Sequence, residues 1–215
     1  MAFSFPRIYP ILDSSFLPQD SRAAFLDSLG RSLAENGVTL LEYRNKMGTV
    51  DEILTDTEIL RRAMPATKLI LDDRADLVEQ TGFDGVHVDA GDISIAEARK
   101  LLGPDRMIGT FGGPADNGFM LLTGILSEPA DYFAIGPVFT TTTKQTSKSP
   151  IGIDGVRELR FQAGPGPILT AAAGITLETA PQVLEAGATT VAVAAAIFQS
   201  ADPAAEYRRW SERLK

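Results

Sequence analysis

Short apolar runs alternate with longer amphipathic segments along the whole chain. The apolar runs are typical of strands buried on both faces, and the segments between them have the spacing of helices with one buried face. We predict strands over residues 7–13, 38–46, 68–73, 85–89, 107–111, 132–139, 167–172 and 190–197. We predict helices over residues 21–36, 51–63, 74–81, 94–102, 114–127, 153–162, 176–186 and 203–214.

Local signals support several of these helix boundaries. Ser or Thr followed three residues later by Glu is the capping-box pattern, and Pro directly after Asp is typical of a first helical turn. These patterns occur at Thr49 with Glu52, Ser94 with Glu97, and Asp202 with Pro203. Glycines stand where helices should end, at Gly37, Gly82, Gly103 and Gly187.

The repeated strand-then-helix order predicts parallel strands, because each return to the same edge of a sheet needs a crossover helix. Eight such units close naturally into a barrel, so we predict a single-domain α/β (β/α)8 TIM barrel over residues 1–215, with no linker dividing it. The alternative is an open doubly wound sheet, whose first strand is followed by a glycine-rich fingerprint. Here that strand ends in Leu12-Asp13-Ser14-Ser15, which favours the barrel.

Composition narrows the classes of partner. Lys and Arg total 20 against 28 Asp and Glu, a net charge of −8, so attraction to nucleic acid or to an anionic membrane surface is not expected. The longest apolar stretch, 191–198, is far shorter than the roughly 20 residues that span a bilayer, and the first residues lack the pattern of a signal peptide. We therefore expect a cytoplasmic protein. With no cysteine, a metal would need oxygen ligands or the single histidine, His87.

Charges interrupt the predicted barrel on its second strand. Glu42, Arg44 and Lys46 share one face, where a small barrel normally carries branched apolar side chains, and burying them unpaired would be costly. One interpretation is a functional group of charges at the carboxyl end of the barrel, where barrel enzymes place their chemistry. The other is a strand end that emerges into solvent with its charges paired.

More acidic residues follow the next two strands. Asp73 and Asp92 come at or just past the ends of adjacent strands, so they could bind one cation, and oxygen ligands favour Mg²⁺. Asp72 and Asp92 could equally be a helix cap and a turn former. His87 is either a hydrogen-bonded structural residue or a group close to a bound ligand.

Two further segments have the character of phosphate sites. The loop over residues 140–150 carries several hydroxyls and two lysines, which are donors suited to phosphate oxygens, although a flexible solvated linker has the same composition. After the seventh strand Gly174 opens a helix, and Ala194 and Ala195 follow the eighth strand. Small residues there let backbone N–H groups approach a phosphate, or they serve only tight packing.

The order of these residues resembles the thiamine phosphate synthase family over nearly the whole chain. The resemblance is carried by LILDDRADLVEQTGFDGVHVDAGDI, ARKLLGPDRMIG, GPVFTTTTK and AAAGITLETAPQVLEAGATTVAVAAAIF. It implies a Mg²⁺-dependent transferase of (β/α)8 fold. The family joins an aminopyrimidine methyl diphosphate to a thiazole phosphate, giving thiamine phosphate and pyrophosphate, and a homodimer is expected.

The resemblance also implies roles for individual residues. Arg44, Lys46 and Lys144 match basic residues that contact the diphosphate, and Asp73 and Asp92 match two magnesium ligands. The residues that match the thiazole phosphate side are Thr141, Thr143, Gly174, Ala194 and Ala195.

The chain departs from the family at several substrate-binding positions: Glu42 and Ala90 replace Gln, Asp72 replaces Asn, Phe111 and Ala195 replace Ser, and Ala173 replaces Gly. A phenyl ring at Phe111 is expected to fill space in the pyrimidine pocket. Two other functions stay open. One is a thiazole tautomerase, although that branch relies on a histidine where this chain has Gly113, and the other is a non-catalytic barrel that binds phosphorylated metabolites.

Overall fold

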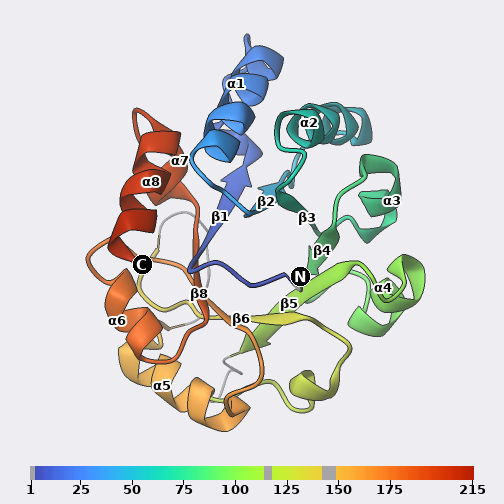
Figure 1. Ribbon diagram of the computed structural model, residues 1–215. Coiled ribbons are helices and arrows are strands. Elements are labelled where there is room, and N and C mark those ends of the chain that lie inside the picture. Colours follow the sequence, from blue (N-terminus) through green and yellow to red (C-terminus); the bar gives the residue numbers. More distant parts are fainter. Residues whose placement is uncertain (1–2, 114–117, 142–148) are drawn as a thin grey trace.

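The strands form a closed parallel barrel in sequence order, surrounded by helices (Figure 1). The computed structural model describes residues 3–113, 118–141 and 149–215. The strands are β1 (Ile8–Asp13), β2 (Leu40–Arg44), β3 (Lys68–Asp72), β4 (Gly85–Val88), β5 (Met107–Gly113), β6 (Tyr132–Ile135), β7 (Leu169–Ala172) and β8 (Thr190–Val193). The helices are α1 (Arg22–Glu35), α2 (Val50–Ala63), α3 (Val78–Thr81), α4 (Ile95–Leu102), α5 (Gly152–Ala163), α6 (Ala180–Glu185), α7 (Ala195–Phe198) and α8 (Pro203–Arg213), with short 3-10 turns at η1 (Ser14–Phe16), η2 (Ala75–Leu77) and η3 (Ile125–Ser127). The predicted (β/α)8 TIM barrel is confirmed.

Strand register decides which side chains face the barrel interior. β1 closes the barrel by pairing with β8, where Ile8 lies opposite Val191, and Ile11 lies opposite Glu42 of β2. Because alternate residues of a strand face opposite sides, Glu42 points into the barrel while Tyr43 points toward the helices. The carboxyl end of β2 therefore presents charge to the interior, as its pattern predicted.

The apolar core has two parts. The larger part lies between the barrel and the helices, and the smaller part fills the barrel interior near its amino-terminal end. The buried residues of this inner part are Tyr9, Leu40, Ile70, Tyr132 and Ala192. The inner part stops short of the carboxyl end, which leaves room there for a ligand.

The segment before β1 lies across the amino-terminal end of the barrel (Figure 1). The ring of Phe5 packs on that of Tyr132, with centroids 5.3 Å apart. Gly109 of β5 makes room for the Tyr132 ring, since a Cβ at this glycine would lie 1.9 Å from Tyr132 Cζ. These contacts close one end of the barrel and hold Tyr132 in its interior.

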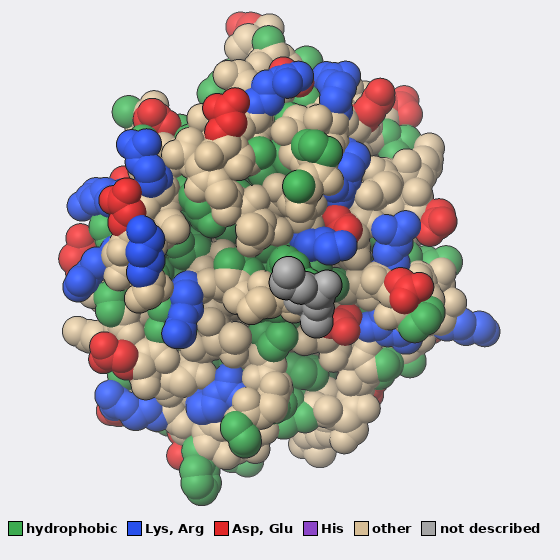
Figure 2. Space-filling model, in the orientation of Figure 1, with side chains coloured by type: hydrophobic (Ala, Val, Ile, Leu, Met, Phe, Trp, Pro, Cys, Tyr) green, Lys and Arg blue, Asp and Glu red, His purple; other side chains and the backbone are tan. Residues whose placement is uncertain are grey.

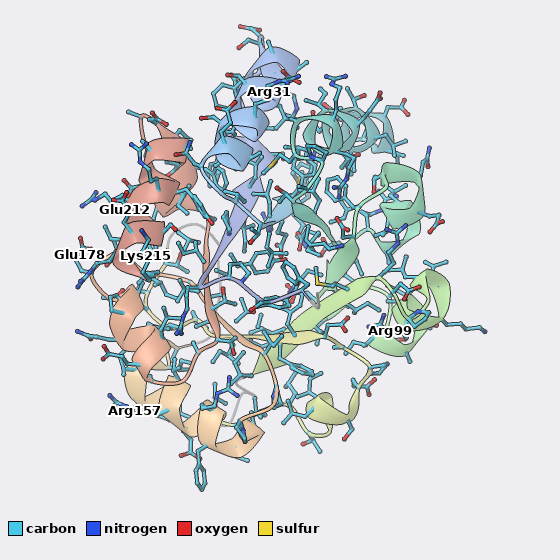
Figure 3. All side chains as sticks on the ribbon, viewed as in Figure 1. Arg31, Arg99, Arg157, Glu178, Glu212 and Lys215 are labelled. Atoms are coloured by element: carbon cyan, nitrogen blue, oxygen red, sulfur yellow. The ribbon has the colours of Figure 1, made fainter. Side chains whose placement is uncertain are left out.

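Arginines near helix ends tie the helices to the loops that precede the strands. Arg99, labelled beside α4 in Figure 3, donates to the Arg106 carbonyl at 2.6 Å and to Asp131 at 2.7 Å, just before β5 and β6. Arg160 of α5 donates to the Pro167 carbonyl at 3.0 Å and to the Gly187 carbonyl at 2.7 Å, before β7 and β8. These bonds fix neighbouring strands relative to one another at the end opposite the predicted site.

Most predicted helix boundaries are confirmed, including both capping boxes and the Asp202 cap before Pro203. The helix predicted over residues 114–127 is wrong, because within the described residues 118–127 only the single turn η3 forms. Gly118 and Gly124 there adopt positive φ angles of 107° and 74°, which interrupt a right-handed helix. The last four residues of the predicted eighth strand, 194–197, are also not strand; β8 ends at Val193 and α7 begins at Ala195.

The face drawn in Figure 2 carries charged side chains of both signs together with hydrophobic ones. Figure 2 shows acidic and basic side chains interspersed around this face. In the described part of the chain, no helix is both long and apolar enough to cross a lipid bilayer.

Candidate active site

A cavity of about 680 Å³ opens at the carboxyl ends of the strands, and all eight strands contribute residues to its walls. This volume lies in the range typical of small-molecule sites. Phe111 and Ala90 line the cavity without filling it. The expectation that the Phe111 ring takes up space in the pyrimidine pocket stays a prediction.

One side of the cavity is lined by Arg44 of β2 and Asp72 of β3, and Lys46 and Asp73 lie next to these residues. Arg44 bonds to Asp13, and its Nε lies 3.3 Å from Asp72 Oδ2. Lys46 Nζ lies 3.3 Å from the same oxygen and also bonds to Asp73. Arg44 and Lys46 are thus paired, and Glu42 and Arg44 line the cavity, which combines the two interpretations of the sequence. Asp13, the partner of Arg44, was not among the predicted site residues.

The structure places Asp73 beside Asp92. Burial raises the pKa of the Asp92 carboxyl, and a hydrogen bond shared with Asp73 raises it further. The Asp89 backbone N–H donates to Asp92 Oδ2 at 2.8 Å, which fixes the orientation of that carboxyl. Asp73 has a positive φ of 63°, a conformation that Asp and Asn tolerate better than most residues. The turn after β3 therefore directs this carboxyl toward the loop after β4.

This corner fits a hard divalent cation. Asp73 Oδ1 and Asp72 Oδ2 are both buried and accept no hydrogen bond, and Asp72 Oδ2 has two ion-pair partners, Arg44 and Lys46, each at 3.3 Å. Among the described residues no group of three or more acidic, histidine or cysteine side chains is placed to enclose a metal. Mg²⁺ in phosphate-handling sites is commonly held by one or two carboxylates together with substrate phosphates and water, and two adjacent aspartates match that pattern.

The floor of the cavity is a hydrogen-bonded cluster of four buried side chains. Tyr9 donates to Glu42 Oε2 at 2.8 Å, and the Tyr9 and Tyr132 hydroxyls are also 2.8 Å apart. His87 Nδ1 lies 3.2 Å from the Tyr132 hydroxyl. Sequence analysis missed Tyr9 and Tyr132. The signal was available, because both occupy inward positions of predicted strands where branched apolar residues are usual.

Acidic neighbours shift the pKa values of two side chains at the floor of the cavity, Asp72 and His87. Burial, together with the charge of Glu42, raises the pKa of Asp72 to about 7. Burial alone would lower the pKa of His87, but Asp89 and Glu42 outweigh it and raise that pKa to about 9. Both ring nitrogens have polar neighbours, with Nδ1 3.2 Å from the Tyr132 hydroxyl and Nε2 3.6 Å from Asp89 Oδ1.

The opposite side of the cavity is formed by small residues after β7 and β8. Ala194, Ala195 and Gly174 all line it, and Thr141 lines it from the loop after β6. Gly174 has a φ of 68°, and a Cβ there would lie 2.5 Å from the Thr140 carbonyl oxygen, so only glycine fits. The other two residues predicted for phosphate contacts, Thr143 and Lys144, lie outside the described residues.

The state of His87 can be measured directly, because it is the only histidine of the chain. In metal-free protein, we expect its imidazole proton resonance to titrate with a midpoint near pH 9 in NMR spectra. Glu42→Gln should lower the midpoint, since it removes a negative charge that favours the imidazolium. A midpoint at or below the ordinary 6.5 in the folded wild-type protein would contradict the hydrogen-bonded arrangement.

A closed (β/α)8 barrel with acidic, basic and small-residue walls around a cavity at its carboxyl end has the arrangement of barrel enzymes, whose small-molecule sites lie at that end. The profile of the family described as "Thiamine monophosphate synthase" matches residues 8–197, and the chain belongs to this family. The chain is 39% identical to the thiamine-phosphate synthase of Koribacter versatilis over 191 residues, covering 88% of each protein. It is 37% identical to that of Agrobacterium fabrum over 202 residues, covering 91% of this chain and 88% of the relative.

Solved structures agree on the fold. The thiamine phosphate pyrophosphorylase from Pyrococcus furiosus superposes with a TM-score of 0.77 at 22% identity, covering 97% of this chain and 96% of that one. A 3-hexulose-6-phosphate synthase superposes with a TM-score of 0.69 at 18% identity, covering 97% of this chain and 100% of that one. At these identities the likenesses show the barrel fold alone.

Proposed function

We propose that this protein is a thiamine-phosphate synthase, which joins 4-amino-2-methyl-5-pyrimidinylmethyl diphosphate to a thiazole phosphate and releases pyrophosphate. Membership of the family and the relatives of that name support the reaction. The observation that carries it in the structure is the position of Arg44, which lines the cavity beside Asp72, with Lys46 3.3 Å from the same aspartate and small residues on the other side of the cavity. One cavity can thus receive two phosphorylated substrates at once.

Each rim suits one substrate. Arg44 and Lys46 would contact the diphosphate, and their positive charges would stabilise the negative charge that it gains on leaving. Asp73 and Asp92 would hold Mg²⁺, which supplies further charge neutralisation to the leaving diphosphate when bound. The backbone around Gly174 and Ala194 would face the thiazole phosphate. No nucleophile from the protein is needed, because the electron-rich pyrimidine can expel diphosphate with the bonding electron pair, and the lone pair of the thiazole nitrogen then captures the methylene cation.

For the loop after β6, the roles of individual residues are proposed from the family resemblance. Thr141, Thr143 and Lys144 would close the phosphate contacts from that side. Two further proposals also rest on the resemblance alone, a cytoplasmic location and assembly as a homodimer.

Turnover and its need for a divalent cation test the proposed function. With both substrates and Mg²⁺ the purified protein should form thiamine phosphate and pyrophosphate, which chromatography and a pyrophosphate assay detect. Removing the metal with a chelator should abolish measurable turnover, and added Mg²⁺ should restore it, because excess negative charge at Asp73 and Asp92 otherwise repels the diphosphate.

The two other candidate functions give different results in the same experiment. Tight binding of the thiazole phosphate in calorimetry without any product would indicate the non-catalytic barrel. Isomerisation of the thiazole phosphate alone would indicate a tautomerase. The structure offers no support for the latter, because Gly113 stands at the end of β5 and the single histidine lies on β4.

A further inference from the structure

Lys46, which the proposed reaction uses, lies in a loop beyond the end of β2. The strand ends at Arg44 and the capping residue of α2 is Thr49, so Lys46 belongs to the loop over residues 45–48. Its side chain is 34% exposed and pairs with Asp73. Because partly exposed ion pairs contribute little, the place of the Lys46 ammonium depends on how the backbone of this loop is held.

The Asn45 side chain spans this loop. Its Oδ1 accepts from the Gly48 backbone N–H at 2.8 Å, and its Nδ2 donates to the Tyr43 hydroxyl at 3.2 Å. Asn45 is half-buried, whereas Lys46 and Met47 are exposed. The two hydrogen bonds therefore close the loop into a turn whose tip carries Lys46 and Met47.

Gly48 leaves the space that the Asn45 amide occupies. A Cβ at Gly48 would lie 2.3 Å from Asn45 Nδ2 and 2.7 Å from Asn45 Oδ1. Gly48 does not have a positive φ, so its backbone conformation does not itself call for glycine. The glycine is explained by the amide packed against it, which makes the two residues one structural unit.

The Tyr43 hydroxyl is the fixed point to which Asn45 is tied. Tyr43 is fully buried on the outward face of β2, and its hydroxyl donates to Asp56 of α2. The same oxygen accepts from Arg22 of α1 at 3.2 Å as well as from Asn45. A phenol has one proton and two acceptor positions, so all of them are used. The Asn45 amide must therefore turn its nitrogen to Tyr43, which leaves its oxygen for Gly48.

This fixed point is shared by two helices on the outside of the barrel. Arg22 Nε donates to Asp56 Oδ2 at 2.9 Å and to Asp56 Oδ1 at 3.1 Å, which joins α1 to α2 (Figure 1). Asp56 is 2% exposed, and a buried charge-assisted pair of this kind has a fixed geometry. Through Asn45, the network that joins the helices to β2 thus also reaches the loop that carries Lys46.

We propose that Asn45 is a positioning residue, which holds its loop against Tyr43 so that the Lys46 ammonium meets the diphosphate. This inference rests on the proposed function and adds a residue to it. Asn45 does not line the cavity, so its effect on the reaction passes through Lys46. Side chains on the outward face of β2 thereby hold the charge that acts on its inward side.

A fixed loop improves both binding and departure of the diphosphate. Lysine has a flexible four-carbon stem, and a loose backbone beneath it would add to the conformational entropy lost when the ammonium is immobilised on an anion. A charge held in place also acts fully on the leaving group, whereas a displacement of about 1 Å can cost about a hundredfold in rate. Loss of the Asn45 amide should therefore weaken both steps.

Two variants disturb the loop by different routes. Asn45→Ala removes the amide, and Gly48→Ala places a methyl group where the amide lies. For each we expect kcat/KM for the pyrimidine diphosphate to fall about tenfold, while KM for the thiazole phosphate stays unchanged. Gly48→Ala should add nothing in the Asn45→Ala background, because the methyl group then enters space that the amide has left. A further tenfold loss in that double variant would contradict the arrangement of the loop and overturn the inference.

A double-mutant cycle measures whether Asn45 acts through Lys46. The probe is inorganic pyrophosphate with Mg²⁺, titrated by calorimetry, so that binding is measured without turnover. We expect Asn45→Ala to raise the Kd about tenfold in the wild-type background and to change it less than about twofold in the Lys46→Ala background, because residues that act as a unit are not additive. The same cycle in kcat/KM should give the same result. Equal losses in both backgrounds, or no loss in either, would overturn the inference.

Asn36→Ala is the matched control. Asn36 ends α1 at the amino-terminal end of the barrel, is half-buried like Asn45, and donates to the Ser32 carbonyl at 2.9 Å. Its loss should leave the Kd for pyrophosphate and kcat/KM within about twofold of the wild type. A loss equal to that of Asn45→Ala would show that the layer of helices responds to any such change, and would overturn the special role of Asn45.

The inference and the proposed function fail in different ways. Coupling of Asn45 to Lys46 in pyrophosphate binding, in a protein that forms no thiamine phosphate, would support the inference and overturn the reaction. Turnover with wild-type kcat/KM in Asn45→Ala would support the reaction and overturn the inference. A wild-type protein that neither binds pyrophosphate nor forms thiamine phosphate would overturn both.

Discussion

Asp73→Asn is expected to lower kcat/KM by about 10²- to 10³-fold, the cost typical of removing one group that stabilises charge in a transition state. The carboxylate pairs with Lys46, lies beside Asp92, and has a buried Oδ1 that accepts no hydrogen bond. Replacing it with an amide removes the charge that a divalent cation needs there. It also leaves Lys46 without one of its partners.

Asparagine is the informative substitution at this position because of the backbone. Asp73 has a φ of 63°, which Asn adopts more readily than Ala. The variant should therefore melt close to the wild-type temperature, so that its lost activity reports on the site and not on folding. Raising the Mg²⁺ concentration should restore part of the rate if the loss is in metal affinity.

Asp76→Asn is the control for this experiment. Asp76 lies in the next turn, is 60% exposed in its side chain, and pairs with Arg74. Its activity should stay within about twofold of the wild type, as for most surface substitutions. Equal losses in the two variants, or full activity in Asp73→Asn, would show that Asp73 has no special part in the reaction.

Asp56→Ala is expected to destabilise the protein by about 3–5 kcal/mol, the largest effect on stability that we predict. Asp56 of α2 is 2% exposed and accepts from Arg22 Nε at 2.9 Å and from the buried Tyr43 hydroxyl. Alanine would leave the partly buried guanidinium and the phenol without their acceptor. For a chain of this size the change corresponds to a fall in Tm of roughly 6–20 °C, which thermal unfolding by circular dichroism measures.

The matched control is an aspartate with two arginine partners on the surface. Asp27 bonds to Arg31 of its own helix and lies 3.4 Å from Arg62 of α2, but both arginines are more than half exposed. Asp27→Ala should cost no more than about 1 kcal/mol, because exposed ion pairs contribute little. Similar losses of stability in Asp56→Ala and Asp27→Ala would contradict the view that burial is the reason why the ion pair of Asp56 stabilises the fold.

The pattern along the chain predicted the order of strands and helices because each unit is stabilised locally. Thr49 with Glu52 and Ser94 with Glu97 cap their helices through contacts between residues three apart. The error over residues 118–127 has a local cause as well, since the apolar residues there have helical spacing while Gly118 and Gly124 take positive φ angles. The spacing of apolar residues favours a helix and the two glycines favour a turn, and the spacing by itself does not show which of these preferences determines the structure.

The candidate site was predicted unevenly for a related reason. Arg44, Asp73 and Asp92 could be found because charge at the end of a buried strand is unusual. Tyr9 and Tyr132 were missed, because the only signal was a tyrosine at an inward strand position, and the role of such a residue depends on what lies opposite it.

The sequence by itself determined the (β/α)8 architecture, the helix caps and the end of the barrel at which charge gathers, because these depend on periodicity and on neighbours along the chain. Only the tertiary structure decided the floor of the cavity. Tyr9 meets Tyr132 across 123 positions of sequence and His87 meets Tyr132 across 45. Such contacts exist only when β1 pairs with β8 and the barrel closes with one register. Gly109 then leaves the space that lets the Tyr132 ring lie inside, which no local pattern of the sequence specifies.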